Sequence, residues 1–306
     1  MGNRVDAVLI AGPTASGKSR LALALADALG GTVINADSMQ VYREPRILTA
    51  RPRITDMSRV PHMLYGHVGA CEAYSVGRYQ TDAARALAGV RGVGRVPIFV
   101  GGTGLYFSAL TDGLANIPPI PASVRAAGRG RLEEIGVAAL HAELSSRDPE
   151  TAAQLRASDP QRVLRAWEVL EATGRPLARW QKAMGKPVLD AMRLAKFVLD
   201  VPRRELRSRI ETRFKAMLDE GAMEEAALLH GLDPALPAAK ILGLRELWAL
   251  KSGALDQTQA IQAAVTATRQ FAKRQTTWLR HRMKDWNWLE LQDSSNILPV
   301  IMSQLT

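Results

Sequence analysis

Short apolar runs alternate with longer segments of helical periodicity through the first third of the chain. The runs at residues 5–11, 32–36 and 96–100 have the composition and length of buried strands. Between them, residues 19–29 and 76–90 carry apolar side chains at helical spacing. This alternation is typical of a parallel sheet with helices on its faces, so we predict an α/β fold.

The pattern changes near residue 114. A proline-rich stretch at residues 116–121 is followed only by helical patterns as far as residue 190. One of these helices is predicted in detail, with Asp159 as its N-cap, Pro160 at its first position and Gly174 at its end. We therefore expect an all-helical subdomain at residues 116–190, inserted between a first core part at 1–115 and a completing part at 191–306.

Strand composition returns at residues 197–201, which indicates that the chain re-enters the sheet after the insertion. A long amphipathic helix is predicted from Pro202 to His230. The rest of the C-terminal part is mostly helical in pattern and carries several basic segments, and a final strand is predicted at residues 286–289.

A glycine-rich motif lies between the first strand and the first helix. It consists of Gly12, Pro13, Thr14, Ala15, Ser16, Gly17, Lys18 and Ser19, which match the spacing G-x-x-x-x-G-K-[ST]. In this motif backbone N–H groups converge on phosphate oxygens, Lys18 reaches the outer phosphates and Ser19 can ligate Mg²⁺. We predict a P-loop NTPase-like core, and the motif leaves open whether ATP, another nucleotide or a different diphosphate is bound.

Two more polar clusters directly follow predicted strands. The first is Asp37, Ser38, Met39 and Gln40, and the second is Gly101, Gly102, Thr103 and Gly104. Ligands bind outside the carboxyl ends of the strands in doubly wound sheets, so both clusters are expected near the bound phosphates. Asp37 could serve as a general base, help to hold Mg²⁺ or only cap a helix. The glycine run could be a tight turn, with Thr103 as a helix cap.

The charge of the chain favours a polyanionic partner. Forty Lys and Arg residues against thirty Asp and Glu give a net charge of +10. Residues 269–284 contain six Lys or Arg and no acid, with Phe271 and Trp278 as aromatic neighbours that stack on bases or pack in the core. Arg209 and Arg213 share a helix face and either reach toward a diphosphate or pair with nearby acids.

Other patterns exclude several classes of protein. The single cysteine, Cys71, rules out an internal disulfide and is expected to be a buried or inert thiol, and the five histidines lack metal-ligand spacing. No signal peptide or membrane span is apparent, so a cytoplasmic protein is expected. The strand at 96–100 ends in glycine rather than in the Asp of ATP hydrolases, which leaves Asp200 as the only similar candidate.

Seven sequence blocks, taken in order, carry a family resemblance. They are GPTASGKS, ADSMQVYR, VPHML, GGTGLY, DPQRVLRA, ILGLREL and TRQFAKRQTTWLR. Together they resemble the tRNA dimethylallyltransferases, also called tRNA isopentenyltransferases, over nearly the whole chain. One block departs from the family, since Leu48 stands where Gly-Thr-Ala-Lys-Pro begins and Arg51 replaces its lysine. The chain also has no C-terminal zinc finger of the eukaryotic type, which favours a bacterial form.

The resemblance implies transfer of the dimethylallyl group from dimethylallyl diphosphate to the exocyclic N6 amine of the adenosine 3′ to the anticodon, in tRNAs that read codons starting with U. It implies Mg²⁺, with Asp37 as the general base, Thr103 at the target nucleotide, and Lys18 with Arg209 or Arg213 at the diphosphate. The tRNA-binding residues implied are Asp37, Ser38, Met39, Gln40, Thr103, Arg125, Gln161, Arg162, Val163, Leu164, Arg165, Lys240, Ile241, Leu242, Gly243, Leu244 and Arg245. A monomer is expected, with neither a membrane nor an obligate protein partner.

Two other functions are compatible with some of the same sequence features. A small-molecule or nucleotide kinase also combines a phosphate-binding loop, a helical lid and arginines. An RNA-binding P-loop protein could use nucleotide binding only as a switch. Neither requires Asp37, Thr103 and the ordered blocks together, so we favour the transferase.

Overall fold

The computed structural model describes residues 5–290 and 297–305. These residues form two compact units. The first combines the described residues up to Leu110 with those from Val188 onward, and the second is Thr111–Pro187. The second unit begins and ends a few residues before the expected limits of 116 and 190.

The first unit is built on a six-stranded parallel sheet. Its order is β3-β2-β4-β1-β5-β6. The strands are β1 (Ala7–Ala11), β2 (Gly31–Asn35), β3 (His62–Met63), β4 (Val96–Gly101), β5 (Leu194–Asp200) and β6 (Asn287–Glu290). The predicted α/β fold with its parallel sheet is confirmed, and β3 is a short addition that the pattern did not predict. Residues of β1, β2 and β4 are buried along their whole length, which explains their continuous apolar runs.

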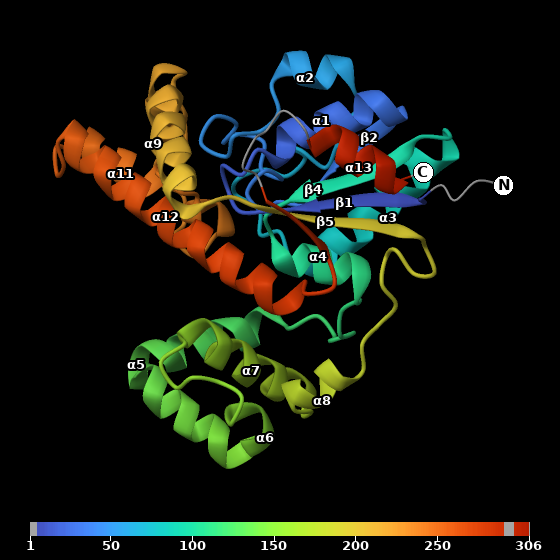
Figure 1. The fold of residues 1–306 in the computed structure, drawn as a ribbon. Helices are drawn as coiled ribbons and strands as arrows, with labels where there is room; N and C mark the ends of the chain where they lie inside the picture. Colours follow the sequence, from blue (N-terminus) through green and yellow to red (C-terminus); the bar gives the residue numbers. More distant parts are fainter. Residues whose placement is uncertain (1–4, 291–296, 306) are drawn as a thin grey trace. The chain divides into compact units, whose positions relative to one another are not determined.

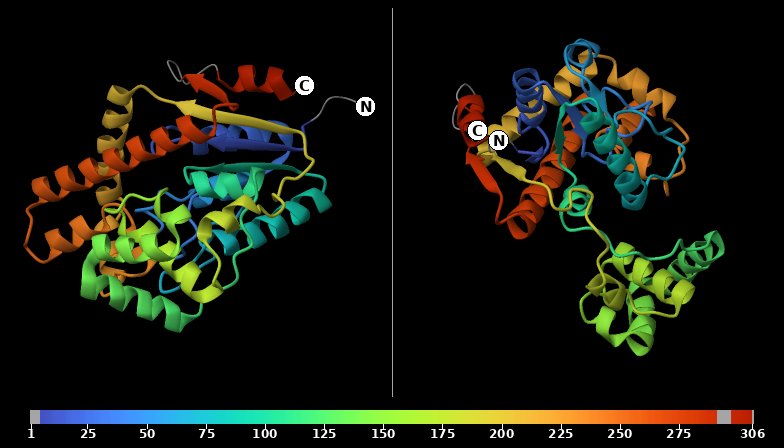
Figure 2. Two further views of the ribbon diagram at one scale, coloured as in Figure 1. Left: turned by 90° about the horizontal axis from the view of Figure 1, so that it is seen from below. Right: turned by 90° about the vertical axis from the view of Figure 1, so that its right-hand side faces the viewer.

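Helices cover both faces of this sheet, with α1 and α13 on one face and α3 on the other (Figures 1 and 2). The helices of the first unit are α1 (Lys18–Leu29), α2 (Ile54–Arg59), α3 (Val76–Gly92), α4 (Gly104–Thr111), α9 (Arg203–Asp219), α10 (Ala222–Leu228), α11 (Leu244–Lys251), α12 (Gln257–Arg282) and α13 (Ile297–Leu305), with a 3₁₀ turn, η1, at Pro237–Lys240. The single helix predicted from Pro202 to His230 is wrong. Gly221 adopts a left-handed φ of 103° and separates α9 from α10.

The second unit consists of α5 (Ala122–Arg147), α6 (Pro149–Ala152), α7 (Pro160–Thr173) and α8 (Leu177–Lys182). The predicted limits of α7 are confirmed. The Asp159 side chain accepts a hydrogen bond from the Arg162 N–H at 3.1 Å, and Gly174 ends the helix with a φ of 65°. Buried side chains of α5 and α7, among them Leu140 and Val163, give this unit an apolar core of its own.

The described residues also bear on the expectations about membrane helices and about the single cysteine. None of their helices is long and apolar enough to cross a membrane. Cys71 is exposed, so of the two alternatives expected for this residue, a buried or an inert thiol, the buried one is wrong.

Candidate active site

The glycine-rich motif forms the turn between β1 and α1. Gly17 has a φ of 90°, which aims the first N–H groups of α1 into the turn. Gly12 is required by space, because a Cβ there would lie 2.8 Å from Ser16 Oγ. Ser16 Oγ is buried and has no hydrogen-bond partner among the described residues. The turn therefore has the close backbone approach that a phosphate-binding loop needs.

Lys18 lies at the centre of a group of charged side chains. Its ammonium donates to the carbonyl oxygen of Pro13 at 3.2 Å. Burial lowers the pKa of Lys18 to about 8; the Asp37 carboxylate opposes this shift, and the Arg213 guanidinium adds to it. Lys18, Asp37 and Arg213 are therefore close enough to interact, although they come from three different segments.

The two arginines of α9 have different partners. Arg213 Nη2 donates to the hydroxyl of Thr14 at 2.7 Å, and burial lowers the pKa of Arg213, whereas Asp37 raises it. Arg209 pairs with Glu205 and lies 3.4 Å from the carbonyl oxygen of Ser16. Arg213 is thus directed at the phosphate-binding loop. Arg209 contacts the loop as well, but it also pairs with an acid, as one of the two alternatives from the sequence expected.

Asp37 begins a tightly bonded turn after β2. Its Oδ1 accepts the Met39 N–H at 3.0 Å, and the buried side chain of Asn35 bonds to its main chain. Thr103 Oγ1 accepts the Ser38 N–H at 2.9 Å. The turns after β2 and β4 are thereby joined, which brings the predicted residues Asp37 and Thr103 into one site.

Close packing explains the glycines of the second turn. A Cβ on Gly101 would lie 1.9 Å from the Ala36 carbonyl oxygen, one on Gly102 would lie 2.2 Å from Gln275 Nε2, and one on Gly104 would lie 2.1 Å from the Trp278 ring. None of the three has a positive φ. The alternative that only glycine fits this turn is therefore supported, and the reason is lack of space rather than a positive φ.

Gln275 is a site residue that the sequence did not single out. Its Oε1 accepts the Thr14 N–H at 2.8 Å, and its Nε2 donates to the Gly102 carbonyl oxygen at 2.9 Å. One signal was present, because Gln275 is a polar residue on the buried face of α12 that also carries Ala272 and Leu279.

Two tyrosines, the half-buried Tyr65 and the buried Tyr106, lie near Asp37. Burial raises the pKa of Tyr65 and of Tyr106, and the Asp37 carboxylate raises both further. Both phenols are therefore neutral at physiological pH. Tyr106 also stacks on Tyr79, with ring centroids 3.7 Å apart.

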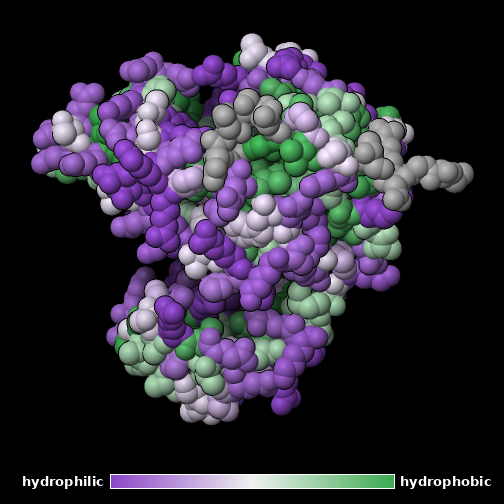
Figure 3. Space-filling view, viewed as in Figure 1, coloured by the Kyte–Doolittle hydropathy of each residue, from purple (hydrophilic) through white to green (hydrophobic). Residues whose placement is uncertain are grey.

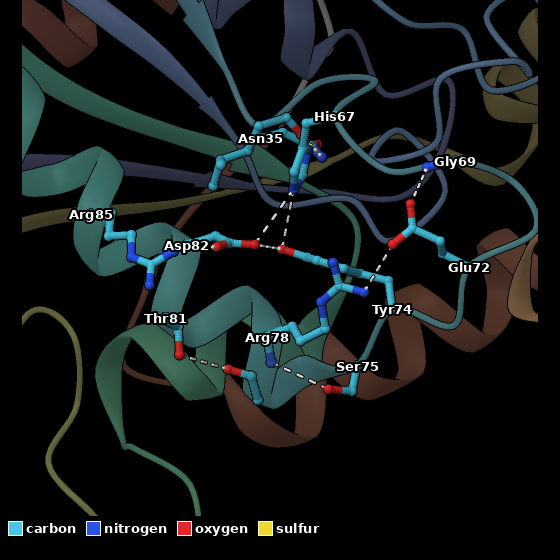
Figure 4. Close-up of polar contacts among 12 residues, drawn as sticks. Asn35, His67, Gly69, Glu72, Tyr74, Ser75, Arg78, Thr81, Asp82 and Arg85 are labelled. Atoms are coloured by element: carbon cyan, nitrogen blue, oxygen red, sulfur yellow. Dashed lines mark hydrogen bonds and ion pairs between the residues drawn. The ribbon is translucent and has the colours of Figure 1, made fainter.

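A polar network holds the segment that leads from β3 to α3 (Figure 4). The Tyr74 hydroxyl donates to Asp82 Oδ2 at 2.8 Å, and His67 Nε2 lies 3.4 Å from the Tyr74 hydroxyl. Burial lowers the pKa of His67, and Asp82 opposes that shift. His67 is therefore held in this network in its neutral form.

A basic cavity of about 790 Å³ lies between α9 and α12. Six Lys or Arg side chains and two acids line it, namely Arg203, Arg204, Arg207, Arg269, Lys273, Arg280, Asp200 and Glu290. Asp200 pairs with Arg280 at 3.1 Å. Hydrophilic side chains cover this part of the surface (Figure 3). On the same helix Trp278 packs against the core, while the ring of Phe271 lies beneath the guanidinium of Arg274.

The predicted tRNA-binding residues of the second unit share one region. Arg125 of α5 and Arg165 of α7 both interact with Glu168, whose pKa is raised by burial and lowered by these arginines. Gln161 and Arg162 are exposed and Leu164 is half-buried, whereas Val163 is fully buried in the core of this unit. An RNA contact at Val163 would therefore have to come from its main chain.

The segment from Lys240 to Arg245 contains a similar mixture. Lys240 and Arg245 are exposed and Leu242 is half-buried, whereas the side chains of Ile241 and Leu244 lie in the core of the first unit. RNA contacts at these two positions would therefore have to come from the main chain. Gly243 has a φ of 86°, and a Cβ there would lie 2.7 Å from the Phe214 ring.

The departure at Leu48 has a simple structural account. Leu48 is not among the residues with positive φ, so the missing glycine leaves no backbone strain. Its side chain is buried, with its Cδ2 lying 3.6 Å from the position of a Cβ on Gly243. Arg51 donates to the carbonyl oxygens of Tyr42 and Arg43 at 2.9 and 3.1 Å, so it fixes the loop.

Comparison with known proteins places the chain in one family. The family model described as IPP transferase matches residues 40–282, and the isopentenyl transferase model matches residues 5–63. The chain is 50% identical to a tRNA dimethylallyltransferase of Rhodopseudomonas palustris, over 98% of this chain and 94% of the relative. It is 49% identical to the same enzyme of Rhizobium meliloti, over 94% and 96%.

Solved structures agree with this assignment. A tRNA isopentenylpyrophosphate transferase from Bacillus halodurans is 32% identical, covers 99% of this chain and 95% of its own, and superposes with a TM-score of 0.68. A eukaryotic dimethylallyltransferase acting on tRNA is 27% identical, with coverage of 97% and 76% and a TM-score of 0.81. The resemblance stated from the sequence blocks is confirmed: this chain belongs to the IPP transferase family, the family of the tRNA dimethylallyltransferases.

Proposed function

We propose that this chain transfers the dimethylallyl group from dimethylallyl diphosphate to the N6 amine of the adenosine 3′ to the anticodon of tRNAs reading codons that begin with U. The observation that carries this proposal is the convergence of Lys18, Arg213 and Asp37, which come from segments that follow β1, β5 and β2 of one parallel sheet. The cations suit a leaving diphosphate, and the carboxylate suits a proton acceptor. A single chain supplies all these groups, so a monomer suffices.

The cations would act on the bond that breaks. As the allylic carbon separates from oxygen, the electron pair goes to the diphosphate and negative charge grows there. Lys18, Arg213 and the N–H groups of the loop are preorganised to stabilise it. Because the carbon becomes cationic, the site must also hold the amine close to it.

The carboxylate would act on the bond that forms. The N6 nitrogen attacks the allylic carbon and must lose one proton, which Asp37 accepts. Thr103 is joined to the turn of Asp37 by its hydrogen bond with Ser38 and would contact the same nucleotide. The adenosine must leave its stack to enter the site, at a cost of a few kcal/mol.

The residues of the loop fit Mg²⁺. Ser19 lies in the first turn of α1 with an exposed side chain, and its hydroxyl has no hydrogen bond to another described residue. Mg²⁺ keeps several waters and prefers phosphate oxygens, so one hydroxyl ligand from the protein suffices. Bound there, Mg²⁺ would neutralise part of the diphosphate charge.

Basic surface would hold the tRNA. The cavity between α9 and α12 carries an excess of cations, and Arg203, Arg204, Arg207, Arg269 and Lys273 form no ion pair with a described residue. Such side chains suit a phosphate backbone. The predicted tRNA contacts with accessible side chains in the second unit are Arg125, Gln161, Arg162, Leu164 and Arg165. In the first unit they are Ser38, Met39, Gln40, Lys240, Leu242 and Arg245. The buried residues Val163, Ile241, Gly243 and Leu244 would contribute main-chain contacts.

One experiment tests the function directly. The protein is incubated with dimethylallyl diphosphate, Mg²⁺ and unmodified tRNA, and the tRNA nucleosides are then analysed. We expect adenosine to be converted to its N6-dimethylallyl derivative and diphosphate to be released in equal amount. Unmodified adenosine together with rapid ATP turnover would contradict the proposal and favour a kinase.

A further inference from the structure

We propose that Gln275 is a positioning residue that aligns the diphosphate-binding loop with the turn that carries Thr103. The inference rests on the proposed function, because that function assigns the prenyl donor to the diphosphate-binding loop and the acceptor nucleotide to the turn that carries Thr103. Gln275 acts through the main chain of both segments and touches neither reactant.

The carboxamide of Gln275 connects two main-chain groups. Thr14 N–H donates to Oε1 at 2.8 Å, and Nε2 donates to the Gly102 carbonyl oxygen at 2.9 Å. An N–H can only donate and a carbonyl oxygen can only accept, so these partners fix the orientation of the amide. Gln275 is 7% exposed, so water does not replace these bonds at low cost.

The two bonds lie within a longer connected path. On one side, Arg213 Nη2 donates to Thr14 Oγ1 at 2.7 Å. On the other side, Thr103 follows Gly102 directly, and its Oγ1 accepts the Ser38 N–H at 2.9 Å. Among the described residues, only the side chain of Gln275 bonds both to the phosphate-binding loop and to the turn at Gly102. Gln275 therefore connects Arg213, which bonds to Thr14, with the turn that begins at Asp37, which bonds to Thr103.

The surrounding packing leaves little freedom for this side chain. A Cβ on Gly102 would lie 2.2 Å from Gln275 Nε2 and 3.2 Å from the Gly12 carbonyl oxygen. One helical turn further along α12, Trp278 lies against Gly104 in the same way. A glutamine on a packed helix thus sets the separation of two loops that would otherwise be connected mainly through their strands.

This arrangement has a consequence for the loop itself. Because Thr14 N–H is already bonded to Gln275, it is not free for a phosphate oxygen, and the diphosphate must use the N–H groups that follow it. Loss of the carboxamide would free this N–H and release the Gly102 carbonyl. The donor and the acceptor would then be held less accurately, which can cost about 10²-fold in rate for a displacement of about 1 Å.

The test compares Gln275→Leu and Gln275→Glu with Gln262→Leu. Leucine removes both bonds, and glutamate keeps the acceptor for Thr14 N–H but cannot donate to Gly102. Gln262 is an exposed glutamine of the same helix and serves as the matched control. For each protein we would measure kcat per folded molecule, tRNA binding, and the diphosphate released relative to the prenyl groups transferred.

We expect Gln275→Leu to lower kcat about 10²-fold, with unchanged tRNA binding and with more diphosphate released than prenyl group transferred. The excess arises when water attacks the allylic carbon, the carbon–oxygen bond of the donor breaks, and dimethylallyl alcohol, diphosphate and a proton are formed. Gln275→Glu should show the same excess to a smaller extent. A merely structural role would lower the folded fraction without changing this ratio.

Three results would overturn the inference. One is wild-type kcat and equal release in both Gln275 variants, and another is an equal loss in Gln262→Leu. The third is failure of both variants to fold, which would make Gln275 a structural residue. If the wild-type protein itself transferred no prenyl group to tRNA, the proposed function would fail instead, so the two failures are distinguishable.

Discussion

Asn35 bonds to the main chain of Asp37 on both sides: its Oδ1 accepts the Asp37 N–H at 2.8 Å, and its Nδ2 donates to the Asp37 carbonyl oxygen at 2.9 Å. The same Nδ2 donates to the carbonyl oxygen of Leu64 at 3.0 Å. Leu64 has a left-handed φ of 64°, which costs a non-glycine residue energy. One buried side chain at the end of β2 therefore fixes the candidate base and the strained loop beside it.

Asn35→Asp should destabilise the protein and slow the reaction. The substitution keeps the shape but cannot donate to Asp37 and Leu64, and it places a carboxylate in a buried position. We expect a loss of about 1–3 kcal/mol in the free energy of unfolding, measured by urea denaturation, together with a lower kcat. Thr32→Val is the control, because Thr32 is equally buried on the same strand. Equal losses in both variants would contradict the positioning role of Asn35.

Asp37→Ala should remove catalysis and leave tRNA binding largely intact. General base catalysis contributes about 10²–10⁴-fold, so kcat should fall within that range. The measurement pairs steady-state kinetics with tRNA binding by fluorescence anisotropy. Asp190→Ala, which changes an exposed aspartate, should behave as the wild type. If tRNA binding vanished in Asp37→Ala, then Asp37 would be a binding residue rather than the base.

The lowered pKa of Lys18 predicts that kcat/KM for the donor falls as the pH rises. Burial lowers its pKa from 10.5 to about 8, so the free enzyme loses this charge as the pH rises through about 8. We expect kcat/KM for dimethylallyl diphosphate to fall over the same range, because the neutral amine no longer attracts the diphosphate. Lys215→Met, at an exposed lysine of α9, should keep the same profile. A profile that stays flat to pH 10 would show that Lys18 does not bind the donor in its charged form.

The same shift has the opposite effect on the stability of the ligand-free protein. The unfolded chain, with the higher pKa, binds this proton more tightly than the folded protein. The contribution of Lys18 to the free energy of unfolding therefore rises between about pH 8 and 10.5. Bound diphosphate would raise the pKa of Lys18, so donor binding should reduce this slope.

Local patterns predicted the parts of the fold that depend on neighbouring residues. The limits of α7 followed from Asp159, Pro160 and Gly174, because each acts on the backbone next to it. The break at Gly221 was missed, since the apolar periodicity continues on both sides of that glycine. Apolar spacing reports which face is buried and does not reveal a change of helix direction.

Long-range contacts explain what the sequence did not predict in the site. The phosphate-binding loop and the turns at Asp37 and Thr103 follow strands, so the topology of the sheet brings them together. Gln275 bonds to Thr14 across 261 positions of the chain. No sequence spacing connects such a pair, and a single glutamine in a sequence does not indicate which residue it will bond to.

The carboxylate of Glu225 accepts hydrogen bonds from three main-chain N–H groups. Those of Arg46, Ile47 and Leu48 donate to it at 2.8, 2.7 and 2.8 Å. Glu225 is 7% exposed, so no water can take over all three bonds when the carboxylate is removed. Each buried donor left without a partner costs about 1–3 kcal/mol. Glu225→Ala should therefore lower the free energy of unfolding by about 3 kcal/mol or more in urea denaturation, with Glu225→Gln in between.

The neighbouring Glu224 is exposed and makes Glu224→Ala the matched control, with a negligible expected loss. The carboxylate of Glu225 also holds Leu48 near Gly243 and Phe214, the residue after Arg213. Donor binding should thus weaken in Glu225→Ala even at temperatures where the protein stays folded. If Glu225→Ala and Glu224→Ala were equally stable, the three N–H groups would have other acceptors, and Glu225 would not be the residue that fixes this loop.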